Sequence, residues 1–105
     1  MSRQVRLEPE AEEELVAAAA HDERLVRGLG PEFVAATSAA IRRLRSWPKS
    51  GSPVDSVDPP LGVRRVPVPR FPYQLVDVRS GGDVHVIEVA HDARRPGYWT
   101  DRIPE

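Results

Sequence analysis

Apolar residues recur at helical spacing in two segments of the first half of the chain. The first segment follows Pro9, a residue favoured at the first position of a helix, and keeps an apolar face across residues 11–26. Gly28-Leu29-Gly30 ends it. A second apolar stripe runs from Pro31 to Trp47 and stops before a proline. Because few residues join the two segments, we predict an antiparallel helical hairpin.

The remaining segments read as strands and one loop. Residues 4–7 alternate and predict a short strand, residues 49–60 are rich in proline, serine and aspartate and predict a loop, and residues 62–68 predict another strand. Residues 74–79 and 84–90 then form a hairpin around Gly81-Gly82. A turn centred there pairs Arg79 with Val84, Val78 with His85 and Val76 with Ile87.

The expected register assigns the two faces of this strand hairpin. One face carries the apolar residues that we expect to cover the helices, namely Val76, Val78, Ile87 and Val89. The other mixes apolar with acidic residues and is expected to meet a partner: Tyr73, Leu75, Asp77, Val84, Val86 and Glu88. The predicted fold is therefore α+β, with an N-terminal helical hairpin packed on a small, mainly antiparallel sheet of three to four strands. Residues 1–105 form one domain.

Composition narrows the possible environments. The 105 residues include 40% hydrophobic residues and no cysteine, so disulfides and thiolate metal sites are excluded and a reducing cytoplasm is expected. No apolar run approaches the ~20 residues of a membrane span. The net charge of −1 provides no overall field that would draw the chain onto nucleic acid. The basic residues occur in short groups along the chain, and all of them are arginines except Lys49.

The end of the strand hairpin carries most of the candidate chemistry. His91 follows the last predicted strand, and Arg94, Arg95, Tyr98 and Trp99 come soon after it. Guanidinium groups and aromatic rings are typical of recognition surfaces. Two plainer interpretations stay open: His91 as an ordinary surface histidine, and the two rings as a hydrophobic latch that fastens the C-terminal segment to the sheet.

The order of elements and four motifs resemble the RelE/ParE superfamily of type II toxin–antitoxin toxins. The motifs are Val5-Arg6-Leu7-Glu8-Pro9-Glu10-Ala11, Arg64-Arg65, Arg70-Phe71-Pro72-Tyr73 and Val89-Ala90-His91-x-x-Arg94-Arg95-Pro96-Gly97-Tyr98-Trp99. The resemblance implies a toxin encoded beside an antitoxin that neutralises it in a tight complex. It also implies one of two targets, DNA gyrase for ParE-like members or mRNA on the ribosome for RelE-like members.

Departures from the family pattern bear on this choice. RelE-like nucleases use several lysines and arginines, whereas this chain has one lysine, so the resemblance favours a ParE-like gyrase poison that is not an enzyme. Asp77 stands where members tend to carry an aromatic residue, and Glu8 where a serine or threonine helix cap is common. A metal-independent endoribonuclease, or a decayed toxin that survives as a binding partner, is the alternative.

Each interpretation has its own residues. The target-binding surface is expected at Arg94, Arg95, Pro96, Tyr98 and Trp99, and the antitoxin contacts at Tyr73, Leu75, Val84 and Val86. A nuclease would use His91 or Tyr98 for proton transfer and stabilise the charged phosphate with Arg64, Arg65, Arg94 and Arg95. Arg64 and Arg65 point to opposite faces of their strand, so at most one serves a given site. No metal, cofactor, small-molecule substrate or membrane is expected as a partner.

Overall fold

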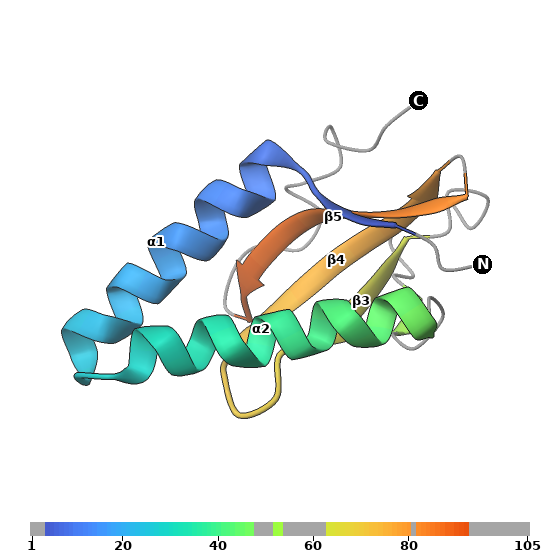
Figure 1. The fold of residues 1–105 in the computed structure, drawn as a ribbon. Helices are drawn as coiled ribbons and strands as arrows, with labels where there is room; N and C mark the ends of the chain where they lie inside the picture. Colours follow the sequence, from blue (N-terminus) through green and yellow to red (C-terminus); the bar gives the residue numbers. More distant parts are fainter. Residues whose placement is uncertain (1–3, 48–51, 54–62, 81, 93–105) are drawn as a thin grey trace.

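Two helices and a five-stranded sheet make up the protein in its computed structural model, which describes residues 4–47, 52–53, 63–80 and 82–92. The bounds are β1 Val5–Leu7, α1 Pro9–Leu25, α2 Leu29–Ser46, β2 Ser52–Pro53, β3 Arg64–Pro67, β4 Tyr73–Ser80 and β5 Asp83–His91. The helical hairpin lies on one side of the sheet (Figure 1). In the described part of the chain, neither helix is long and apolar enough to cross a membrane.

The turn between the helices is held by a side chain from α1. Gly28 adopts a left-handed φ of 90°, which glycine takes at little steric cost. The Glu23 carboxylate accepts hydrogen bonds from Gly28 N at 2.9 Å and from Gly30 N at 3.0 Å, so it satisfies amide groups at the start of α2. At Gly30 the helices are so close that a Cβ atom would lie 2.8 Å from the Ala19 carbonyl oxygen. The predicted hairpin is confirmed.

The sheet has the order β1-β5-β4-β3-β2, and every neighbouring pair is antiparallel except β1 with β5. The register of Arg79 with Val84 and of Val78 with His85 is as predicted. Val76 instead lies opposite Glu88, because a β-bulge interrupts the pairing between positions 76 and 77. The two-residue strand β2, which pairs with β3, falls inside the segment expected to be a loop.

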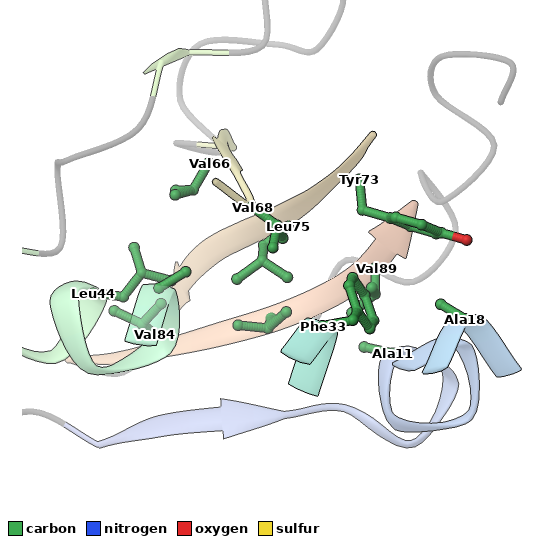
Figure 2. Packing of buried hydrophobic residues seen from close by; sticks show 12 residues of the cluster. Ala11, Ala18, Phe33, Leu44, Val66, Val68, Tyr73, Leu75, Val84 and Val89 are labelled. Carbon is green, nitrogen blue, oxygen red and sulfur yellow. The ribbon is translucent and has the colours of Figure 1, made fainter. Parts of the chain in front are cut away.

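The predicted orientation of the β4–β5 hairpin is wrong. Leu75, Val84 and Val86 have no exposed surface and belong to the same core cluster as Phe33 and Leu44 of α2 (Figure 2). Tyr73, also expected to face a partner, is 7% exposed and joins that cluster. Val89, expected on the helix-covering face, does lie there.

The opposite face of the hairpin is also apolar, which explains the error. Val76, Val78 and Ile87 are at most 3% exposed, although they do not belong to the cluster beneath the helices. The alternation of residues along a strand fixes which residues share a face. It does not decide which face packs against the helices when both faces are apolar.

The apolar stripes of both helices end earlier than their sequences suggest. Leu25, Val26 and Trp47, which were assigned to the stripes, are 65%, 57% and 69% exposed. Val26 already has an extended backbone, with φ −143° and ψ 124°, and Trp47 follows the last residue of α2. The side chains therefore leave the helical face where the helices stop.

Glu8, which occupies the N-cap position of α1, makes no side-chain capping hydrogen bond. Its Oε1 atom instead lies 2.6 Å from Nδ1 of His85 on β5. The departure from a serine or threonine cap thus exchanges a local bond for one that ties the start of α1 to the sheet.

Candidate functional site at the open end of the strand hairpin

The candidate site lies where β4 begins and β5 ends. Tyr73, the first residue of β4, pairs with His91, the last residue of β5. One residue further on, the Asp92 amide donates a hydrogen bond of 2.8 Å to the Pro72 carbonyl oxygen. This bond continues the strand pairing by one residue beyond β5. His91 and Asp92 are both exposed, and their backbone is held in place by the sheet.

His91 is positioned by the aromatic ring beneath it. The rings of His91 and Tyr73 meet edge to face, with centroids 5.2 Å apart and planes at 80°. The Tyr73 ring packs in turn on Phe33 of α2, at a centroid distance of 4.8 Å. A chain of three rings therefore connects the exposed imidazole to the core.

Tyr73 keeps its phenol neutral in this setting. Burial raises the pKa of Tyr73, and the nearby Asp22 carboxylate of α1 raises it further. Asp22 is itself 5% exposed. In Figure 2 the Tyr73 hydroxyl points away from the core cluster. Tyr73 thus supports His91 from below and is not the surface contact that the sequence suggested.

A hollow of about 400 Å³ opens on the face of the sheet away from the helices, and its lining comes from two strands, β3 and β4, and from the residue after β5. The residues are Arg65 and Pro67 of β3, Gln74 of β4, and Asp92. Arg65 and Asp92 are exposed, so a cation and an anion are available to a ligand there. Gln74 and Asp92 are not among the residues that the sequence predicts for a site.

The two adjacent arginines of β3 have different surroundings. Arg65 lies on the hollow, whereas Arg64 pairs in register with Asp77 on the other face. Asp77 is 1% exposed, and burial raises its pKa to about 7 against the opposing effects of Arg64 and Arg79. The predicted division of the two arginines between faces is confirmed, and it leaves Arg65 as the one that can meet a ligand at the hollow.

The other predicted site residues fall into two groups, those outside the described residues and those buried in the core. Arg94, Arg95, Pro96, Tyr98 and Trp99 lie outside the described residues, so their expected role stays a prediction. Leu75, Val84 and Val86, the expected antitoxin contacts, are buried in the core and have no surface to offer in this conformation. Among the described residues, no cluster of histidine, aspartate and glutamate could hold a metal ion.

Comparison with known proteins identifies the fold. No family model matches the sequence, and no curated protein matches it. A solved structure of the chromosomal ParDE TA (toxin–antitoxin) system from P. aeruginosa contains a similar chain, with a TM-score of 0.72 and 18% sequence identity. The match covers 85% of this chain and 95% of that one. The protein therefore shares the fold of that chain of the ParDE system, and the predicted fold class is confirmed.

Proposed function

We propose that this protein is the toxin of a type II toxin–antitoxin system, that it inhibits growth by poisoning DNA gyrase, and that a cognate antitoxin neutralises it. One observation carries the proposal: the likeness to a chain of a ParDE system extends over most of both chains. Action by binding is also consistent with a chain whose cations are almost all arginine. Because gyrase acts on the chromosome, we place the protein in the cytoplasm.

Inducible expression in a bacterial host tests this proposal. We expect growth arrest with double-strand breaks and SOS induction, together with loss of supercoiling by purified gyrase when the protein is added. Co-expression with the product of the adjacent reading frame should restore growth. Normal growth without that product would contradict the proposal and point to a decayed toxin.

Within this function, we assign the gyrase contact to the segment that follows Asp92, namely Arg94, Arg95, Pro96, Tyr98 and Trp99. The backbone bond at Asp92 supports this assignment, because it fixes the point from which the segment departs. The double substitution Arg95→Glu and Trp99→Ala should relieve growth arrest and leave the thermal unfolding midpoint unchanged. Arg24→Ala, at an exposed arginine of α1, is the matched control. Undiminished toxicity of the double variant would exclude this surface.

A RelE-like mRNA endonuclease is the second candidate, and the arrangement around His91 favours it. An exposed imidazole at the end of β5 is chemically suited to take the proton of a ribose 2′-hydroxyl. Arg65 lies on the opposite face of the sheet from the His91 ring, so stabilisation of the charged phosphate in the transition state would fall to Arg94 and Arg95. Primer extension on mRNA from expressing cells separates the candidates, since discrete cleavages within translated frames would favour the nuclease. Such cleavages should then disappear in His91→Ala and in the double variant Arg94→Ala with Arg95→Ala, but persist in Arg24→Ala.

A further inference from the structure

The loop between β3 and β4 contains a tight turn with an unusual residue in its strained position. The Phe71 amide donates a hydrogen bond of 3.2 Å to the Val68 carbonyl oxygen, and Pro69 and Arg70 lie between them. Arg70 has a φ of 72°, the only positive value at a non-glycine position among the described residues. Proline followed by a residue with positive φ defines a type II turn, in which glycine or asparagine normally takes that place.

The surroundings of the turn leave the backbone little choice. Val68 is 1% exposed, and its amide donates a hydrogen bond of 2.9 Å to the Tyr73 carbonyl oxygen. On the other side, the Phe71 ring packs edge to face on Phe33 of α2, with centroids 5.3 Å apart. Both ends of the turn are thus anchored to the core, and Arg70 is held in its left-handed conformation by the residues around it.

Nothing in the described part of the molecule accounts for an arginine at this position. Arg70 is exposed, and its side chain makes no hydrogen bond or ion pair with a described residue. Glycine would fit the backbone without strain. A strained residue that persists without an internal partner indicates a function for its side chain.

The flanking residues indicate what kind of partner would meet it. Arg70 is the single cation of its loop, and the exposed residues nearest to it, Pro69 and Pro72, are apolar. Nucleic acid is usually bound through several cations, about 6–10 phosphate contacts in a typical complex. One guanidinium set among apolar groups instead matches a protein segment that carries a carboxylate beside apolar side chains.

We propose that Arg70 is a contact residue for an acidic segment of the antitoxin, presented by the turn at Val68–Phe71. The inference rests on the proposed function and adds to it a specific surface. The turn fixes the guanidinium in place before binding, so a partner carboxylate meets a cation whose backbone is already ordered.

Binding measurements on matched variants test the proposal. The probe is the purified product of the adjacent reading frame, titrated into the wild-type protein, Arg70→Gly, Arg70→Lys and the control Arg24→Ala. We expect Arg70→Gly to weaken binding by about ten- to a hundredfold, the loss typical of a charge-assisted hydrogen bond. Arg70→Lys should lose less, because it keeps the charge, and Arg24→Ala should bind as the wild type does.

Two further measurements separate this role from a structural one. The thermal unfolding midpoint of Arg70→Gly should equal or exceed that of the wild type, and its binding defect should shrink at high salt. Equal affinity of Arg70→Gly and wild type would overturn the contact and leave the proposed function standing. Failure of the wild-type protein to bind the probe would overturn both. Loss of DNA binding by Arg70→Gly, with antitoxin affinity intact, would overturn the assignment to a protein partner.

Discussion

The helical hairpin and the β3–β4 strand pair both turn through a residue with positive φ, but they meet that demand in opposite ways. In the helical hairpin the residue is glycine, Gly28, and Glu23 satisfies the amides beside it. In the strand pair the residue is Arg70, and the same strand pair buries the Asp77 carboxylate, neither oxygen of which has a hydrogen-bond partner among the described residues. Local rules are obeyed in the first region and broken in the second, and broken rules tend to mark function or stored strain.

The largest expected effect concerns Asp77. Its pKa is raised to about 7, so the folded protein binds this proton more tightly than the unfolded chain does, and stability should fall as pH rises from about 4 to about 7. Relative to Asp77→Asn, the free energy of unfolding of the wild type should drop by up to about 4 kcal/mol across that range and then level off. Urea denaturation at a series of pH values measures the difference.

Asp92→Asn, at an exposed carboxylate after β5, is the matched control for this experiment. Parallel pH profiles for the wild type and Asp77→Asn would contradict the prediction, and would mean that the strand pair stores no electrostatic strain.

Gly30→Val should destabilise the helical hairpin, the region whose turn follows the local rules. The new Cβ would lie 2.8 Å from the Ala19 carbonyl oxygen and 3.1 Å from Cβ of Glu23, so the helices must separate. We expect a loss of about 3 kcal/mol of unfolding free energy, as in other overpacked sites. Chemical denaturation checks this, with Ala35→Val on the exposed side of α2 as control. A similar, small loss in both variants would show that the helices can move apart at little cost.

Gly28→Ala measures only the energetic cost of the left-handed backbone conformation in the same turn. No atom lies within 4 Å of a Cβ added at Gly28, so the substitution introduces strain without a collision. The expected loss is about 1 kcal/mol, the cost of a left-handed conformation for a residue with a side chain. Thermal unfolding monitored by circular dichroism is sufficient, and an unchanged midpoint would mean that the turn relaxes to another conformation.

Arg70→Gly should have the smallest effect on stability, and one of opposite sign. Relief of strain at φ 72° is partly offset by the greater freedom of glycine in the unfolded chain, so we expect a gain of less than about 1 kcal/mol. Measured beside Gly28→Ala under the same conditions, this variant sharpens the comparison between the two turns. A loss of stability in both would mean that Arg70 serves the fold, and would remove the reason to seek a partner for it.

The order of elements was predictable because each element carries its own signal. Pro9 and the acidic residues after it mark the start of α1, the glycines at positions 28 and 30 mark the turn, and the pair at 81 and 82 marks the strand hairpin. The orientation of that hairpin was not predictable, because Val76 and Val78 on one face are as apolar as Val84 and Val86 on the other. The bulge between Val76 and Asp77 was not predictable either, because no glycine or proline within β4 marks it in the sequence.

The candidate site was predictable in part for the same reason. His91 and the separation of Arg65 from Arg64 follow from strand position and alternation alone. Gln74 and Asp92 join Arg65 only through pairing across β3, β4 and β5, which one sequence does not specify. The strained conformation of Arg70 left no signal in the sequence, since proline at the second turn position is compatible with more than one turn type.

The parallel pairing of β1 with β5 sets the order in which this molecule can be assembled. The Val84 amide donates a 3.0 Å hydrogen bond to the Gln4 carbonyl oxygen, and the Glu8 amide donates one to the Val86 carbonyl oxygen. The strand at the start of the chain can therefore pair only after the last strand has been made. During synthesis the helices can form while the sheet edge has no partner, and the native sheet closes only after β5 has left the ribosome. Chains interrupted before that point would lack the edge on which the first strand docks, and would carry the helices without the fold.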